Sequence, residues 1–385
     1  MSPESGYIAQ LVRAFVSGGS AATRPPPGLD WERLGRLLQA HGIGPTVAQQ
    51  IDGSTVPRAF REALALQNHG LHRRGALLGL ELTRLLAQLE RAGVEPVVLK
   101  GLALGRSLYP APSQRVVSDL DLLVRRDALD AAGQALGKLG YRPADEVRHP
   151  QFYAKHHFHL RFRSSAGVLV ELHWDLSRPT DYTRFDLDGF FGRARVIEHG
   201  GAALRVPADS DQLLHAACQA LRRGYADLRR LIDAALLVKV GAAGTPGLAG
   251  TAERQGMATA VWVLLNLGRE LAGPAVPDAV ESALRPRPLV RRCLNSLPLS
   301  EVVLEVDAQH DGLRHLLIWL SAPSLGAAAS EIRQFLVPGE LQLLDEGHDP
   351  GRLPGFWRRG ALTARHTASL LKIAGFQAWR LARSL

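Results

Sequence analysis

The segment VVSDLDLLV, residues 116–124, places two carboxylates inside an otherwise apolar run. A short run rich in Val and Leu predicts a buried strand, and side chains alternate between its faces, so Asp119 and Asp121 point the same way while the neighbouring leucines face the core. Two carboxylates this close repel each other unless a cation lies between them. Because Mg²⁺ binds one or two carboxylates together with substrate phosphates, the pair predicts a metal site for a nucleoside triphosphate. A surface strand is the alternative, and the apolar flanks disfavour it.

A third carboxylate and three histidines follow in a predicted β-hairpin. The segment VLVELHW contains Glu171, and His173 lies two residues further on and therefore on the same face. The preceding strand presents His157 and His159 on one face, and in the register that we expect, His159 lies opposite Glu171. The same register pairs His157 with His173. These histidines are catalytic, bind zinc, or form the polar face of a partly exposed strand, and we favour the polar face over direct catalysis.

Short elements must position these residues. Residues 94–101 predict a strand that ends in glycine, and a short helix, the strand with the two aspartates, a helix at 127–139 and the hairpin follow. Residues 94–176 are therefore predicted to form a small α/β unit.

Helical spacing dominates the chain on both sides of this unit. In residues 76–93 the predicted apolar stripe consists of Leu77, Leu80, Leu85 and Leu89. We expect four regions, namely an N-terminal helical region (1–93), an α/β core (94–206), a helical domain (207–337), and a linker with a basic C-terminal helix (338–385).

Composition is ordinary for a soluble globular protein, since 46% of the 385 residues are hydrophobic and 22% are charged. No apolar run reaches the roughly 18 to 20 residues that a membrane span needs, no secretory signal is visible, and the two cysteines lack metal-ligand spacing. We expect a cytoplasmic protein. The net charge of +9 favours nucleic acid, nucleotides or an anionic membrane as partners. An equally good explanation is a high-GC bacterial composition in which Arg replaces Lys.

The C-terminal residues 356–385 contain no acidic residue and several arginines. This segment either lies on an anionic membrane or acidic partner, or packs as an ordinary helix on the body. We favour the packed helix because apolar residues occur all the way round it.

A resemblance to a known family rests on a series of motifs in order. They are LKGLAL, SLYP, RVVSDLDLLV, LGY and VELHWDL, followed by DQLLHAACQALRRGYADLRRLIDAALLV. Together they resemble the uncharacterised bacterial nucleotidyltransferases of the DNA polymerase β-like superfamily, over roughly residues 30–240. The resemblance implies an α+β fold, with a small mixed-sheet polymerase β-like core flanked by N-terminal and C-terminal helical regions.

The resemblance also implies roles for single residues. Asp119 and Asp121 match the paired metal-binding aspartates of that superfamily, and Glu171 matches its third catalytic, metal-binding carboxylate. The three would hold two Mg²⁺ ions, or Mn²⁺ in their place.

Lys100 and Gly101 match the strand–turn–helix that binds the phosphates of the nucleotide, although the superfamily usually has Gly-Ser or Gly-Gly at this turn. Arg115 matches an arginine ahead of the aspartate pair, for which a phosphate contact is implied. Asp233 and His215 match recurrent polar positions of the helical region, where packing between helices is an equally good explanation.

These inferences predict a nucleotidyltransferase that moves an NMP from an NTP such as ATP to an acceptor and releases pyrophosphate. The acceptor is a small molecule, a protein or RNA, and the RNA case would resemble toxin-like nucleotidyltransferases. The alternative from another class is a non-catalytic nucleotide-binding or scaffold protein on the same fold.

Overall fold

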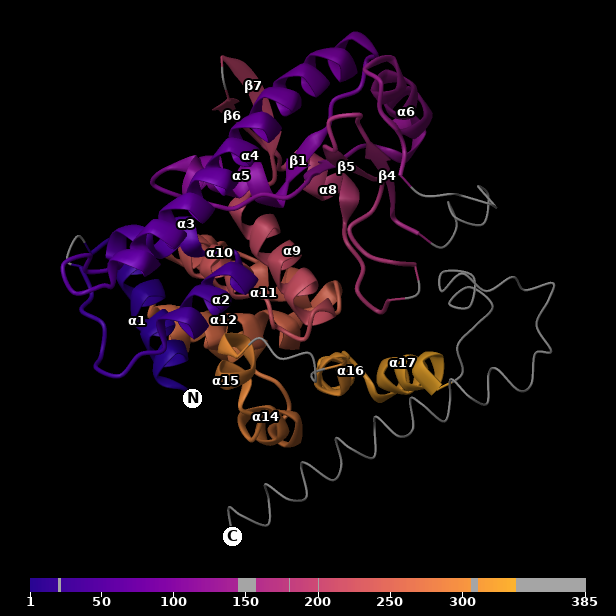
Figure 1. The fold of residues 1–385 in the computed structure, drawn as a ribbon. Helices are drawn as coiled ribbons and strands as arrows, with labels where there is room; N and C mark the ends of the chain where they lie inside the picture. The colour runs from indigo at the N-terminus through magenta and orange to yellow at the C-terminus, as the bar shows by residue number, and fades with distance from the viewer. Residues whose placement is uncertain (20–21, 145–156, 180, 200, 306–310, 337–385) are drawn as a thin grey trace, which may run out of the picture.

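The computed structural model describes the chain except residues 20–21, 145–156, 180, 200, 306–310 and 337–385. The described residues form a mixed β-sheet with helices around it and a larger helical body beside it (Figure 1). The predicted α+β class, with helical regions flanking a mixed-sheet core, is confirmed. The predicted basic C-terminal helix and its membrane contact lie outside the described residues, and the four region boundaries stay predictions.

The main sheet has five strands in the order β1-β2-β5-β4-β3. Strands β2 and β5 are parallel, and the other neighbours are antiparallel. A separate two-stranded sheet, β6-β7, packs beside β1. The strands are β1 (Val97–Leu99), β2 (Leu120–Leu123), β3 (Arg142–Pro143), β4 (His159–Arg163), β5 (Leu169–His173), β6 (Arg195–His199) and β7 (Ala202–Val206).

Helices account for most of the remaining described chain, and none of them is long and apolar enough to cross a membrane. They are α1 (Pro3–Ser17), α2 (Trp31–His41), α3 (Gly44–Val47), α4 (Arg58–Arg91), α5 (Lys100–Ser107), α6 (Leu129–Lys138), α8 (Leu187–Gly192), α9 (Asp209–Arg222), α10 (Leu228–Lys239), α11 (Leu248–Arg254), α12 (Ala258–Ala272), α13 (Asp278–Leu284), α14 (Pro288–Asn295), α15 (Leu299–Leu304), α16 (Asp311–Leu320) and α17 (Leu325–Leu336).

One face of the main sheet is apolar and is covered by α4 and α6 (Figure 1). The first two positions of the predicted stripe on α4 are wrong, because Leu77 and Leu80 are 37% and 73% exposed. The stripe that packs on the sheet is Leu78, Leu82, Leu85 and Leu89. Its spacing of four, three and four residues follows the helical repeat more closely.

The hairpin β4–β5 has a register two residues away from the predicted one. His159 pairs with His173, and Arg161 pairs with Glu171. A three-residue loop that ends in a left-handed residue is a common hairpin turn. Gly167 has φ 76° and fills that last position, which fixes the register. A shift of two residues leaves every side chain on its predicted face.

The N-terminal helices α1 and α2 pack with α9, α10 and α12 in one apolar core. Helix α4 has 34 residues, so it is about 50 Å long, and it runs from this core to the sheet (Figure 1). At the far end of the body, Glu305 accepts hydrogen bonds from Ser5 Oγ (2.7 Å), Ser2 N (3.2 Å) and Arg33 Nη2 (2.6 Å). The N-terminal residues are thus joined to the residue that follows α15.

Replacing this carboxylate tests its contribution to stability. Partial burial opposes ionisation of Glu305, but the hydrogen bonds from Ser5, Ser2 and Arg33 outweigh it and lower the pKa from 4.5 to about 2. Its stabilisation is present above pH 4.5 and is lost as the pH falls towards about 2. We expect the free energy of unfolding of Glu305→Gln to be about 1–3 kcal/mol lower than that of the wild type at neutral pH. This difference should shrink on acidification.

Urea unfolding across this pH range measures both quantities. Glu301→Gln, which removes a carboxylate that is 46% exposed, is the control and should change little. A Glu305→Gln deficit that does not vary with pH would show that ionisation of this carboxyl is not the cause.

Candidate active site

The sheet register brings two of the predicted carboxylates together. In the antiparallel pair β1–β2, Leu99 lies beside Asp121, and in the parallel pair β2–β5, Asp121 lies beside Glu171. The leucines on either side of Asp121 belong to the apolar core under α4 and α6, as predicted. The carboxylates therefore face away from that core.

His173 holds Asp121 and Glu171 close to each other. Its Nε2 lies 3.0 Å from Oδ1 of Asp121 and 3.3 Å from Oε2 of Glu171. Ionised carboxylates only accept hydrogen bonds, so this nitrogen carries a proton. The three residues offer ligand atoms that all lie within 4.8 Å of one another. The oxygens of Asp121 and Glu171 suit Mg²⁺ or Mn²⁺, and His173 orients these two carboxylates through its protonated Nε2.

Asp119 lies one residue before β2 and is not among these three converging residues. Its Oδ1 accepts a hydrogen bond from Ser118 Oγ at 2.9 Å. Burial, and then the charge of the neighbouring Asp121, raise the pKa of Asp119. The main chain ahead of it is fixed by Arg74 of α4, which donates to the Ser118 carbonyl at 3.0 Å.

Lys100 supplies a positive charge from the turn between β1 and α5. Its Nζ lies 2.6 Å from Oδ1 of Asp121. Lys100 has a φ of 47°, and a Cβ on Gly101 would meet Val117 at 2.9 Å, so the turn needs glycine there. No side chain caps the start of α5, and uncapped amide N–H groups at a helix start suit an anion.

The charges of the site shift one another's ionisation. Burial opposes ionisation of Asp121, but Lys100 and His173 outweigh it and hold the pKa of Asp121 well below its usual range. Burial also opposes the charged form of His173, yet its bonds to Asp121 and Glu171 raise its pKa overall. Burial and the neighbouring His173 lower the pKa of His159 to about 4, so this ring is neutral at pH 7.

Residues 27–273 match the family described as uncharacterised nucleotidyltransferase. The chain belongs to this nucleotidyltransferase family. No curated protein matches the chain. Among solved structures, it is similar to an antigenic nucleotidyltransferase-like protein from Paracoccidioides brasiliensis, at 15% identity and a TM-score of 0.30, over 55% of this chain and 95% of that chain. The family agrees with the resemblance stated from the motifs.

Arg115, for which the resemblance implied a phosphate contact, and Asp233, which it matched to a polar position of the helical region, are bonded to each other. Arg115 donates from Nε and Nη2 to the two oxygens of Asp233 at 2.8 and 2.7 Å, and from Nη1 to the Val116 carbonyl at 2.6 Å. Tyr109 also donates to Asp233, at 2.7 Å. The pair is 8% and 2% exposed, so its observed role is to join the loop before β2 to helix α10. Tyr109 belongs to the SLYP motif, but its partner was not predicted.

The histidines occupy three different positions around the site. His159 packs against His173 with ring centroids 5.1 Å apart, and its buried Nδ1 has no hydrogen-bond partner. His157 lies just before β4 and is partly buried. His215 lies on α9 with its Nε2 3.2 Å from Nε2 of Gln219, and burial, then the charge of Lys100, lower its pKa. Among the described residues, the ligand atoms of these histidines form no zinc cluster.

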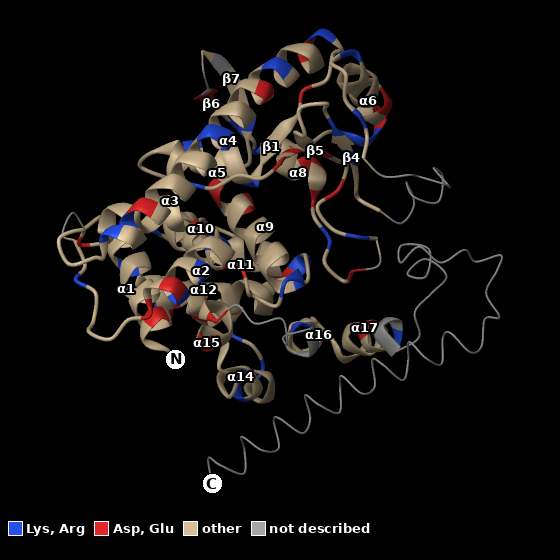
Figure 2. Cartoon of the chain, in the orientation of Figure 1, with Lys and Arg blue, Asp and Glu red and all other residues tan. Residues whose placement is uncertain are grey.

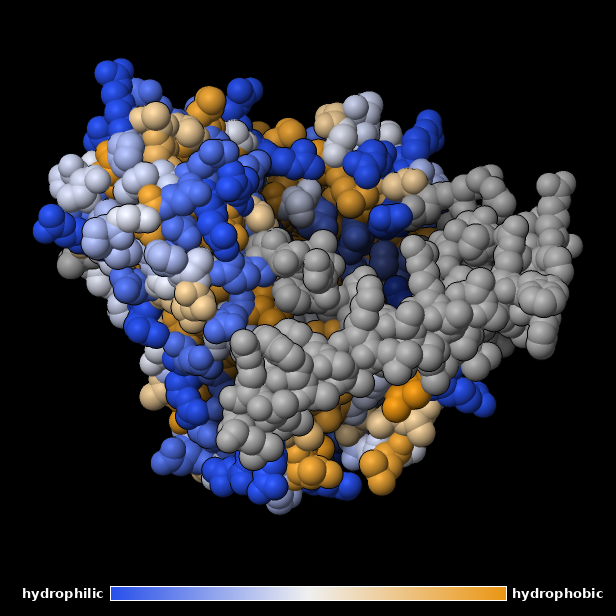
Figure 3. Space-filling model, turned by 60° about the horizontal axis from the view of Figure 1, so that its bottom comes forward, coloured by the Kyte–Doolittle hydropathy of each residue, from blue (hydrophilic) through white to orange (hydrophobic). Residues whose placement is uncertain are grey.

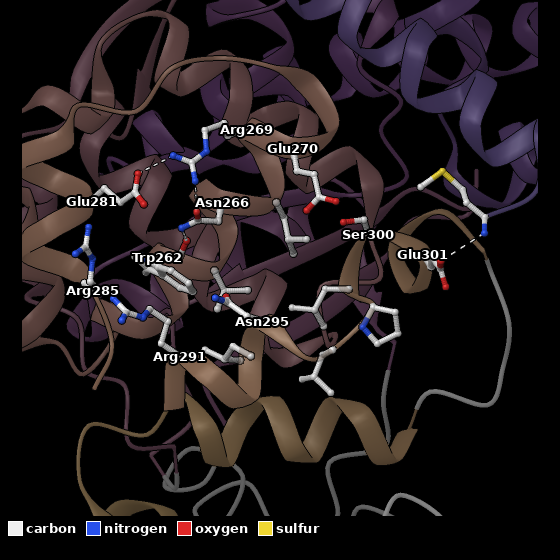
Figure 4. Close-up of a pocket in the computed structure, with 17 residues that line it drawn as sticks. Trp262, Asn266, Arg269, Glu270, Glu281, Arg285, Arg291, Asn295, Ser300 and Glu301 are labelled. Carbon is white, nitrogen blue, oxygen red and sulfur yellow. Dashed lines mark hydrogen bonds and ion pairs between the residues drawn. The ribbon is translucent and has the colours of Figure 1, made fainter. Parts of the chain in front are cut away.

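A separate cavity of about 1030 Å³ lies in the helical body (Figure 4). Trp262, Asn266 and Arg269 of α12 contribute to its wall, and Arg269 donates to Glu281 of α13 at 2.6 Å. None of the predicted site residues is among its described lining residues. The cavity and the carboxylate cluster are therefore separate features of the structure.

The buried pair between Arg115 and Asp233 should contribute strongly to stability. Removing one partner leaves an uncompensated buried charge, so we expect Asp233→Ala to lower the free energy of unfolding by about 3–5 kcal/mol. Asp188→Ala is the matched control, because it removes an exposed Arg125–Asp188 pair at 2.8 Å and should cost less than about 1 kcal/mol. Urea unfolding followed by circular dichroism measures both, and equal small losses would refute the structural role.

Proposed function

We propose that this chain transfers a nucleoside monophosphate from an NTP to an acceptor and releases pyrophosphate, in a reaction that depends on a divalent ion. The observation that supports it is the convergence of Asp121, Glu171 and His173 beside Lys100 at the start of α5. A cluster of carboxylates that can bind a metal thus lies next to an uncapped helix start with a lysine, which can bind phosphate.

Asp119, Asp121 and Glu171 would hold Mg²⁺ or Mn²⁺. When bound, such ions stabilise the attacking and leaving oxygens of an in-line displacement at phosphorus. The bond between the acceptor oxygen and the α-phosphorus forms as the bond to the pyrophosphate oxygen breaks.

The other groups of the site would bind and orient. The amide N–H groups that begin α5 would bind the triphosphate. His173 would keep Asp121 and Glu171 in place through its 3.0 and 3.3 Å contacts. Glu171 would accept the proton of the acceptor hydroxyl as a general base.

The acceptor is a small molecule, a protein or RNA. Described Lys and Arg residues lie on many elements with Asp and Glu among them (Figure 2). Many of the residues coloured in Figure 3 are hydrophilic, with apolar residues among them. A surface of mixed charge favours a small molecule or a protein over a long RNA tract. Because cells supply NTPs in the cytoplasm, we place the reaction there.

The proposal predicts label transfer that depends on the carboxylates. The full chain is incubated with each α-labelled NTP, Mg²⁺ or Mn²⁺, and cell extract divided into small-molecule, protein and RNA fractions. We expect label in one fraction, and rates at least about 100-fold lower for Asp119→Asn, Asp121→Asn and Glu171→Gln. Asp130→Asn, an exposed carboxylate on α6, is the control and should keep the wild-type rate.

Binding separates this proposal from a scaffold on the same fold. A nucleotidyltransferase binds NTP more tightly when Mg²⁺ is present, and the Asp121→Asn variant loses that gain. If the wild type neither transfers label nor binds any NTP in a metal-dependent way, the chain is a non-catalytic member of its family.

A further inference from the structure

Lys100 forms an ion pair with the most buried carboxylate of the site, that of Asp121. Its Nζ lies 2.6 Å from Oδ1 of Asp121, and the two side chains are only 17% and 4% exposed. The same oxygen also accepts the hydrogen bond from His173 at 3.0 Å. A carboxylate oxygen offers about two lone-pair positions, so both positions of this oxygen are taken.

The backbone directs the lysine to this place. Lys100 has the left-handed φ of 47°, which is unfavourable for a residue with a Cβ and persists only where the surroundings fix it. Gly101 beside it fits closely against Val117. Gly101 is non-helical as well (φ 2°, ψ −93°), so Lys100 lies in the turn that leads from β1 into the helical part of α5 and also belongs to the carboxylate cluster.

A divalent ion on Asp121 would compete with this ammonium for the same oxygen. The two positive charges would repel each other at short range in a site with little water. A lysine has a flexible four-carbon stem and binds phosphate as a point charge. A triphosphate at the start of α5 would therefore offer the displaced ammonium a new anionic partner.

We propose that Lys100 is the resident counter-ion of Asp121 and moves to the triphosphate when nucleotide and metal bind together. The inference rests on the proposed function, and it adds that the site binds metal strongly only with the nucleotide. Because binding linkage is reciprocal, nucleotide and metal strengthen each other's binding through this one side chain.

The first test measures Mn²⁺ binding to the full chain by electron paramagnetic resonance of the free ion. Without nucleotide, we expect Lys100→Met to bind Mn²⁺ at least about tenfold more tightly than the wild type, because the competing charge is gone. Lys100→Arg keeps the charge and should stay close to the wild type. Lys138→Met is the matched control, since it removes an exposed lysine on α6.

A mixture of the α,β-methylene analogues of the four NTPs is then added. The wild type should gain Mn²⁺ affinity, and the gain should be at least about threefold smaller in Lys100→Met. Suppose that the wild type transfers label, but Lys100→Met binds Mn²⁺ no more tightly than the wild type binds it. Then only the proposed role of Lys100 is wrong. If neither protein transfers label or binds Mn²⁺ with the analogues, the proposed function fails, and the role of Lys100 fails with it.

The second test needs only the wild type, should Lys100→Met not fold. The chain has five lysines, so the ε-¹³C signals of a lysine-labelled sample are few, and Lys100→Arg identifies the one from Lys100. We expect this signal to shift when Mg²⁺ and the analogues are added together, and to move much less with Mg²⁺ alone. A signal that stays unchanged in the complex would show that Lys100 remains on Asp121.

Discussion

The buried charge of Asp121 constrains everything around it. A carboxylate that is 4% exposed is costly unless cations and hydrogen-bond donors surround it. Its donors come from both neighbouring strands, since Lys100 follows β1 and His173 ends β5. The order β1-β2-β5 is therefore required by the chemistry of the central strand as well as by its apolar face.

The helical body is bonded to the α/β unit that carries the site. Helix α10 carries Asp233 to Arg115, in the loop that leads into β2. Helix α4 spans both parts and also fixes the Ser118 carbonyl ahead of Asp119. The carboxylate cluster thus depends on contacts from segments more than a hundred residues apart in the chain.

The sequence predicted what depends on local alternation. The strand of Asp121, its apolar opposite face and the shared face of Glu171 and His173 all follow from the two-residue period of a strand. The hairpin register was missed because it depends on the left-handed φ of Gly167. The first part of the α4 stripe was missed because adjacent leucines fit either of two helical faces. The β6–β7 hairpin was missed because its alternation is weak, with Val196 63% exposed. Partners far along the chain, such as Asp233 for Arg115, leave no local pattern at all.

The bidentate bond between Arg115 and Asp233 has a consequence for how this chain can be recombined. It ties the loop that leads into β2 to a helix that begins 113 residues later, at Leu228, in a setting closed to water. A chimaera that joined this α/β unit to the helical body of a distant relative would inherit an arginine without its acid. Only an exchange that transfers Tyr109, Arg115 and Asp233 together would keep the contact between the α/β unit and the helical body.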